Sequence, residues 1–434
     1  MFVSLPPVAE QAGRASILVW PVSALIGLVT AVVFAELACR FPGRSGGIAV
    51  IAAEAIRPKR PFLAQLVQWS YWLGWSPALA IGAALLGVFV RHELAPDSSP
   101  WFAWIVACAV LATSVVLNQR GIRACARVHV LLVAGLLLAA ALLAARWSLH
   151  GDLDAGQLTP LAPPGGWGSW GGLQGLMGAL FLAGWSAYGA EIALTYGPEH
   201  RAGPRAAVRS LLATGGVMVV VYSLVPILLV STVGIDRVAD DPANALGLLT
   251  DGGSIATTAL LAIGIVALLL GLDTVAAADS RVLFQMARNG DAWAFLGRVN
   301  RHGAPANALA FDGAWNAALL ALAVVAADGD AAAVPVVLLT AASVGYFTSL
   351  VIALATAWAT RRADPDAPLA FRAPRGLMAL APVVAVLDAA LVVGAGTAWG
   401  WRNVGLGVAL LAGLMLVRPA SARTAALARA AATR

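Results

Sequence analysis

Glu191 is the residue whose type and position most suggest chemistry, because it lies within a long apolar stretch at 173–197. A carboxylate inside hydrocarbon is costly and is usually retained for a function. At this position the side chain could carry a proton, reach the membrane surface or pair with an arginine. Glu191 is therefore our candidate for a proton-coupling residue.

Four aspartates lie in other apolar stretches and pose the same choice between a structural and a functional role. Asp273 and Asp279 are six residues apart, a spacing that does not bring two side chains onto one helix face. We expect Asp279 to be a structural partner of the nearby Arg281. For Asp312 and Asp388 the sequence offers less to distinguish a structural from a functional role.

The histidines and cysteines argue against an enzyme. A membrane-embedded enzyme needs a nucleophile, a metal or an acid–base cluster, whereas the histidines fall in separate loops or helix ends. The cysteines, Cys39, Cys108 and Cys125, lack the paired spacing of a metal or redox motif. We therefore expect no catalytic residue, no metal site and no cofactor.

The composition predicts that membrane-spanning helices position these residues. Of the 434 residues 60% are hydrophobic and 12% charged, whereas roughly a quarter of the residues of a soluble domain are charged. The apolar residues form blocks of about 20 residues, the length that crosses a bilayer. Eleven such blocks are predicted, at 17–38, 62–90, 101–118, 128–146, 173–197, 208–233, 255–286, 307–327, 334–360, 376–397 and 402–417.

The basic residues predict the orientation of these helices, because Lys and Arg are retained on the cytoplasmic side. If the 17–38 block runs inwards, only five of the 28 Lys and Arg residues lie outside, namely Arg14, Arg91, Arg146, Arg237 and Arg402. The C-terminal tail at 418–434 is then cytoplasmic, and the protein belongs to the cell's inner (plasma) membrane. Basic loops facing anionic lipid explain the net charge of +6, and no basic stripe interleaved with aromatic residues predicts nucleic-acid binding.

Several motifs resemble those of the amino acid, polyamine and organocation (APC) transporters. The end of the second helix in that family resembles Phe34-Ala35-Glu36-Leu37, Arg40-Phe41-Pro42 and Gly46-Gly47. Its eighth helix, the following loop and its ninth helix resemble Ser280-Arg281-Val282-Leu283, Met286-Ala287-Arg288-Asn289-Gly290 and Gly303-Ala304-Pro305-Ala306-Asn307-Ala308. Glu36 itself is expected to be a structural hydrogen-bonding residue.

The resemblance implies an all-α membrane fold of two inverted five-helix repeats plus two C-terminal helices, within one domain over 1–434. Residues 1–14 would be the remaining half of a truncated first helix. Helices two to five would occupy 17–146, helices six to ten 173–360, and helices eleven and twelve 376–417. The implied function is secondary transport of amino acids by alternating access, as a permease, exchanger or exporter. The partners would be a small-molecule substrate and the lipid bilayer, and the sequence does not predict the oligomeric state.

The resemblance also places the substrate at breaks in the first and sixth helices, where lipid cannot satisfy the opened backbone and a polar ligand can. Gly184 is the predicted break, although it could instead allow close helix packing with Trp185 facing lipid. Ser186 stands where the family usually has an acidic residue, which favours a neutral amino acid over a polyamine or another amine. The predicted substrate-binding residues are Phe2, Val3, Phe181, Leu182, Ala183, Gly184, Trp185 and Ser186.

Two departures from the family limit the functional prediction. The glycine-rich segment of the first helix would precede Met1, so the start of the chain lies further upstream or half of the site is missing. A missing half would make the chain a transport-incompetent sensor or a degenerate paralogue. Some proton-coupled members carry a Lys in the fifth helix, but the only Lys here is Lys59, in a loop. The remaining candidate transport mechanisms are exchange, facilitated diffusion and proton coupling through Glu191.

Overall fold

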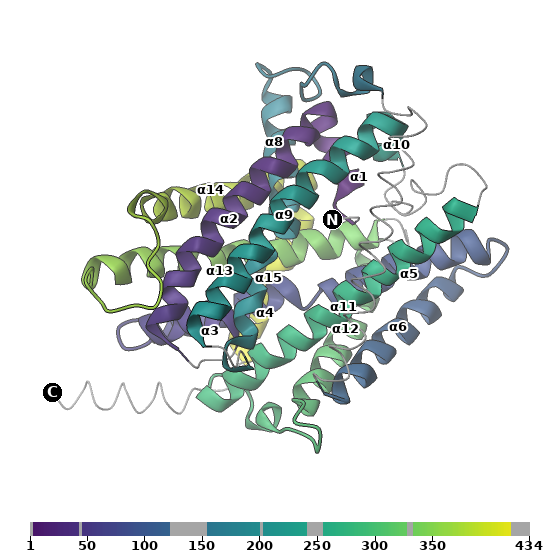
Figure 1. The fold of residues 1–434 in the computed structure, drawn as a ribbon. Coiled ribbons are helices and arrows are strands. Elements are labelled where there is room, and N and C mark those ends of the chain that lie inside the picture. The colour runs from purple at the N-terminus through teal and green to yellow at the C-terminus, as the bar shows by residue number, and fades with distance from the viewer. Residues whose placement is uncertain are drawn as a thin grey trace.

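The computed structural model describes residues 3–42, 46–121, 154–199, 203–240, 255–327 and 333–417, and every regular element in these ranges is a helix (Figure 1). In chain order they are α1 (Leu5–Ala12), η1 (Gly13–Ala15), α2 (Ser16–Arg40), α3 (Gly47–Ile56), α4 (Pro61–Trp75), α5 (Ala78–Leu94), α6 (Trp101–Gln119), η2 (Ala155–Leu158), α8 (Trp170–Ala187), η3 (Gly189–Glu199), α9 (Pro204–Val233), α10 (Ile235–Asp240), α11 (Ile255–Asn289), η5 (Ala294–Gly297), α12 (Ala306–Ala326), α13 (Val334–Ala363), α14 (Arg375–Trp399) and α15 (Trp401–Val417).

Eight helical stretches of the described chain are long and apolar enough to cross a membrane. They are Leu5–Arg40, Pro61–His92, Trp101–Gln119, Trp170–Tyr196, Arg205–Val233, Ala306–Ala326, Val334–Ala363 and Arg375–Trp399. Every predicted apolar block is helical in the structure except 128–146, which lies outside the described residues. The protein is therefore a multi-pass, all-helical membrane protein, as the sequence predicts.

Two details of the helix prediction are wrong. The block at 62–90 is not one helix, because α4 ends at Trp75 and α5 begins at Ala78. The segment at 39–61, which the blocks on either side predict to be a loop, contains the ten-residue helix α3, whose residues Gly47 to Ala53 are buried. Its apolar sequence is too short to span a bilayer, so a search for spanning blocks overlooks it.

The interruption between α4 and α5 follows from Pro77, which has no N–H to continue a helix. The backbone N–H of Ala80 donates instead to Oδ1 of Asn316 at 3.0 Å. One turn earlier on α12, Oδ1 of Asp312 accepts hydrogen bonds from the Ser76 hydroxyl at 2.6 Å and from the Trp72 indole at 3.1 Å. Asn316 thus bonds to the backbone N–H that the turn leaves open, and Asp312 bonds to the side chains that precede the turn.

Helices from the two halves of the chain pack in matching pairs. α1 packs against α8, α2 against α9, α5 against α11 and α6 against α12. Two repeats related by a two-fold axis produce this pattern, because helices near the axis contact their own counterparts. The pairing agrees with the repeat organisation that the family resemblance implies.

α4 and α13 approach each other backbone to backbone. A Cβ atom at Gly74 would lie 2.6 Å from Cα of Tyr346, and one at Gly345 would lie 2.7 Å from the carbonyl oxygen of Ser70. Only glycine fits at both positions. The crossing brings the Trp75 and Tyr346 rings within 5.2 Å of each other, centroid to centroid.

Arginines lie at the ends of α2, α3 and α13, namely Arg40, Arg57 and Arg361, and we call this the arginine-rich end of the bundle. Glu36 is buried there and accepts hydrogen bonds from Arg361, from Arg40 at 3.2 Å and from the backbone N–H of Ala373 at 3.0 Å. These contacts confirm the prediction that Glu36 is a structural hydrogen-bonding residue.

A second buried ion pair lies at the arginine-rich end. Both terminal nitrogens of Arg57 donate to Asp291, at 2.7 and 2.5 Å, and Gln68 adds a hydrogen bond to Asp291 at 3.1 Å. Arg57 is 2% exposed and Asp291 fully buried. The pair ties α3 and α4 to the segment that follows α11.

Candidate functional site

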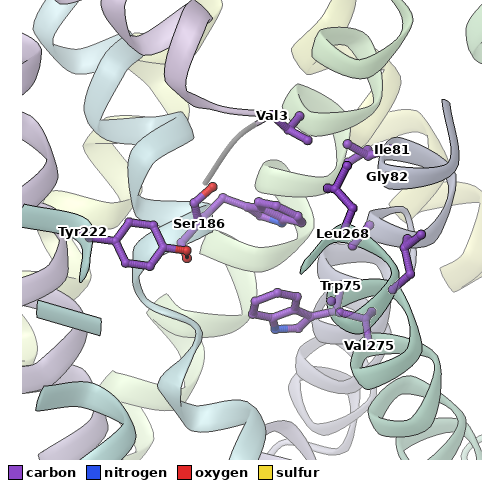
Figure 2. A pocket seen from close by; sticks show the side chains of 12 residues that line it. Val3, Trp75, Ile81, Gly82, Ser186, Tyr222, Leu268 and Val275 are labelled. Carbon is purple, nitrogen blue, oxygen red and sulfur yellow. Dashed lines mark hydrogen bonds between the residues drawn. The ribbon is translucent and has the colours of Figure 1, made fainter. Parts of the chain in front are cut away.

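A cavity of about 290 Å³ lies between the beginning of α1, the end of α8, and helices α4, α5, α9 and α11. Figure 2 shows its lining in two groups, with Tyr222 and Ser186 on one side and Ile81, Gly82, Leu268 and Val275 on the other. Pockets for drug-sized ligands span about 300–1,000 Å³. This cavity therefore suits a small molecule. Its lining residues are Val3, Trp75, Ala78, Ile81, Gly82, Trp185, Ser186, Tyr222, Leu268, Gly271, Leu272 and Val275.

The polar side of the cavity is built around Ser186, in the last turn of α8. Its hydroxyl oxygen lies 2.5 Å from that of Ser4, directly before α1. Its backbone carbonyl accepts a hydrogen bond of 2.7 Å from the Tyr222 hydroxyl of α9. α8 and α9 thus place the hydroxyl groups of Ser186 and Tyr222 at one side of the cavity, where they can exchange hydrogen bonds with a polar ligand, and Ser4 contacts Ser186 from outside the lining.

Trp185 also lines the cavity. Its indole N–H donates to the carbonyl oxygen of Gly74 at 2.7 Å, near the end of α4. Its ring packs against that of Trp75 with centroids 5.4 Å apart. The hydrogen bond fixes the orientation of Trp185, so this indole forms a rigid wall of the cavity.

The predicted break at Gly184 is wrong. α8 continues as an α-helix to Ala187, and the backbone N–H of Tyr188 still bonds to the carbonyl of Gly184 at 3.0 Å. The change of helix type comes after Tyr188, where the 3₁₀ helix η3 begins at Gly189. Mid-chain 3₁₀ segments often mark functional hinges, so the irregular backbone lies just beyond the predicted place.

Gly184 serves close packing instead. A Cβ atom there would lie 2.8 Å from Cζ of Phe347. The Phe347 ring stacks on Phe181, with centroids 5.2 Å apart and planes inclined by 19°. The glycine therefore makes room for this aromatic pair, as the packing alternative predicts. The other part of that alternative is wrong, because Trp185 is buried and bonded to Gly74 and does not face lipid.

The structure brings only some of the predicted binding residues to the cavity. Val3, Trp185 and Ser186 line it. The four residues before Trp185, namely Phe181, Leu182, Ala183 and Gly184, are buried in the core and are not part of the lining. Phe2 lies outside the described residues.

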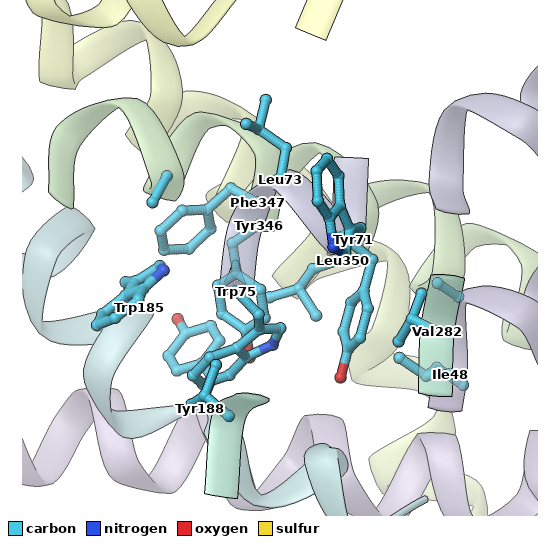
Figure 3. Packing of buried hydrophobic residues seen from close by; sticks show 14 of the residues in the cluster. Ile48, Tyr71, Leu73, Trp75, Trp185, Tyr188, Val282, Tyr346, Phe347 and Leu350 are labelled. Carbon is cyan, nitrogen blue, oxygen red and sulfur yellow. The ribbon is translucent and has the colours of Figure 1, made fainter. Parts of the chain in front are cut away.

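Glu191 lies in η3, fully buried among aromatic side chains, several of which Figure 3 shows. Its Oε1 atom accepts hydrogen bonds from the hydroxyls of Tyr346 at 2.9 Å and Tyr71 at 3.4 Å, and from the Trp75 indole at 3.3 Å. Its Oε2 atom is buried and has no hydrogen-bond partner among the described residues. Neither the membrane surface nor an arginine satisfies this carboxyl group.

Sequence reasoning missed or misjudged several of these residues. The spacing of Trp69, Trp72 and Trp75 by three residues predicts a packing stripe, whereas Trp75 both lines the cavity and contacts Glu191. Tyr222 and Tyr346 carried no signal beyond a hydroxyl group within an apolar block. Pro77 was a usable signal, because a proline inside an apolar block predicts an interrupted helix.

The expected pairing of Asp279 with Arg281 is also wrong. Neither carboxyl oxygen of Asp279 accepts a hydrogen bond from the described residues. Arg281 instead donates to the carbonyl oxygen of Ala277 at 2.7 Å and lies over the ring of Tyr196. The arginine thus points along its own helix and towards η3.

An all-helical membrane fold around a small cavity, with an interrupted helix beside it, is typical of a small-molecule transporter. The chain belongs to the amino acid permease family, whose pattern matches residues 1–402. This match confirms the resemblance to the APC superfamily. The protein is therefore a member of a family of amino acid transporters. A search of curated proteins found no match.

Proposed function

We propose that this protein is a secondary active transporter of neutral amino acids that works by alternating access. The observation that carries the proposal is the cavity between α1, α8, α5 and α11, with hydroxyl groups on one side and aliphatic groups on the other. A zwitterionic head group and an apolar side chain match these two sides.

The lining favours a neutral substrate over a polyamine. None of the twelve lining residues that the structure describes carries a charged side chain. A polyamine is multiply cationic, and a buried cation needs a paired charge to offset its desolvation. Ser186, which stands where the family usually has an acidic residue, supplies a neutral hydroxyl instead.

Within this proposal, the substrate contacts Val3, Trp185 and Ser186 among the residues predicted from the sequence. Phe181 and Gly184 support this site indirectly through Phe347. Glu191 is the coupling residue, because a carboxyl group with one unpartnered oxygen beside the cavity wall can change its hydrogen bonding as a proton arrives or leaves. Trp75 contacts both the cavity and Glu191 and so connects them.

The orientation follows from the positive charges. The arginine-rich end carries Arg40, Arg57 and Arg361. Since basic residues remain on the cytoplasmic side, we assign this end to the cytoplasm and the protein to the plasma membrane. The C-terminal tail is then cytoplasmic too.

Reconstitution into liposomes tests the proposed function. Purified protein should catalyse saturable uptake of labelled alanine or leucine into vesicles preloaded with the same unlabelled amino acid. Ser186→Ala should weaken the apparent affinity, because it removes a hydroxyl at the polar side of the cavity. Ser223→Ala is the matched control, since that hydroxyl bonds to the Val219 carbonyl within α9.

The outcome separates this function from its alternatives. Uptake no greater than in protein-free liposomes would reject transport of neutral amino acids. Uptake of labelled putrescine in place of alanine would identify an amine transporter. Ligand binding without any flux would identify a sensor.

A further inference from the structure

The cavity orients an amphipathic ligand. Its hydroxyl groups lie on one side, at Ser186 and Tyr222, and Figure 2 shows the aliphatic lining on the opposite side. A ligand with a polar head and an apolar tail satisfies both sides only when its tail points towards α5 and α11. The reverse arrangement would place the polar head against aliphatic groups that offer it no hydrogen bonds, which costs free energy.

Gly271 occupies a special place on the aliphatic side. It lines the cavity between Leu268, Leu272 and Val275 on α11. A Cβ atom built at Gly271 meets no described atom within 4 Å. As far as the described residues show, the space that a side chain would fill there is open, unlike the space beside most of the helical glycines that the structure describes.

Gly82, which faces Gly271's helix from α5, differs from it. A Cβ atom at Gly82 would lie 2.7 Å from Cδ2 of Leu272. A substitution there pushes a side chain of the wall and alters packing. A substitution at Gly271 reduces the free space in the cavity without a collision. Gly271 is therefore a position where the size of the cavity can be changed without disturbing the packing around it.

We propose that the apolar side chain of the substrate lies against α5 and α11, and that the missing side chain of Gly271 sets the largest side chain that fits. This inference rests on the proposed function in one respect, namely that the ligand is an amino acid. It adds the class of side chain, aliphatic or aromatic, and the residue that limits its size.

Binding of an amino acid series tests the inference without requiring flux. The affinity of detergent-purified protein for glycine, alanine, valine, leucine and phenylalanine would be measured from ligand-dependent shifts in thermal unfolding. The variants are Gly271→Ala and Gly271→Val. The control is Gly216→Val on α9, another helical glycine with open space around its Cβ position but outside the lining.

The wild-type protein should bind the larger apolar members more tightly than glycine. Each added methyl group at position 271 should weaken binding of the largest accepted ligand by about tenfold or more, since one methylene in an apolar pocket changes discrimination by about 10–200-fold. Binding of alanine should change little. Gly216→Val should leave the whole series unchanged.

Failure of this inference is distinguishable from failure of the proposed function. Equal effects of the Gly271 and Gly216 variants, loss of all ligands alike in the Gly271 variants, or no binding of any member of the series would overturn the inference. A shifted size limit in binding, with no flux in liposomes, would support the inference and reject transport. Flux in liposomes together with an unshifted size limit in binding would support transport and reject the inference.

Discussion

The hydroxyl of Tyr346 donates a hydrogen bond of 2.9 Å to Oε1 of Glu191, across 155 residues of sequence. Tyr346 lies on α13 at the crossing with α4, and Glu191 lies in the 3₁₀ helix that follows α8. The bond therefore joins the irregular backbone beside the cavity to the packed pair of helices behind it.

Replacing Glu191 with glutamine should uncouple transport from protons. Gln keeps the size of the side chain, and its amide oxygen can still accept the Tyr346 hydrogen bond, but it cannot bind or release a proton. We expect uptake driven by an inward proton gradient to fall to the rate of gradient-free exchange. Initial rates in liposomes with and without the gradient measure the change. Glu10→Gln, on the exposed face of α1, is the control, and an unaltered response to the gradient would exclude Glu191 as the coupling residue.

The two tyrosines at Glu191 should differ in importance. Tyr346→Phe removes the shorter bond, of 2.9 Å, and should lower the free energy of unfolding by about 1–3 kcal/mol, the cost of depriving a buried group of its partner. Tyr71→Phe removes a bond of 3.4 Å and should cost less. Thermal unfolding in detergent compares the two variants. A larger loss in Tyr71→Phe would show that the short bond does not dominate.

Gly184→Ala tests whether this glycine serves packing. The added Cβ would lie 2.8 Å from the Phe347 ring, and overpacking of this kind costs about 1–3 kcal/mol. The smaller Phe347→Leu side chain should relieve the clash, so the double variant should be more stable than the two separate losses predict. Gly171→Ala, in open space at the start of α8, is the control. Additive losses in the double variant would disprove a direct clash with Phe347.

The buried pair of Arg57 and Asp291 should be strongly coupled. Arg57→Ala leaves a fully buried carboxylate without its cation and should cost about 3–5 kcal/mol. Removing both partners, as in Arg57→Ala with Asp291→Ala, should restore part of that loss, because no unpaired charge remains. A double-mutant cycle measured by thermal unfolding gives the coupling. A coupling near zero would mean that the ion pair does not stabilise the arginine-rich end.

The membrane class and most of the helices could be predicted from the sequence, because both depend on local composition. A block of about 20 apolar residues crosses a bilayer whichever helices surround it. For the same reason Glu191 stood out, since an acidic residue within such a block is visible without knowledge of its neighbours. The resemblance to a family pattern predicted Val3, Trp185 and Ser186 as substrate-binding residues, and all three line the cavity.

The cavity and the change of helix type were decided only in the tertiary structure. The packing role of Gly184 is visible only beside Phe347, which comes from α13 and occupies the space next to this glycine. The aliphatic side of the cavity requires that α5 and α11 lie opposite Ser186, a relation between segments far apart in the chain. Local sequence predicts which segments are helices, but contacts between distant segments determine where space remains for a ligand.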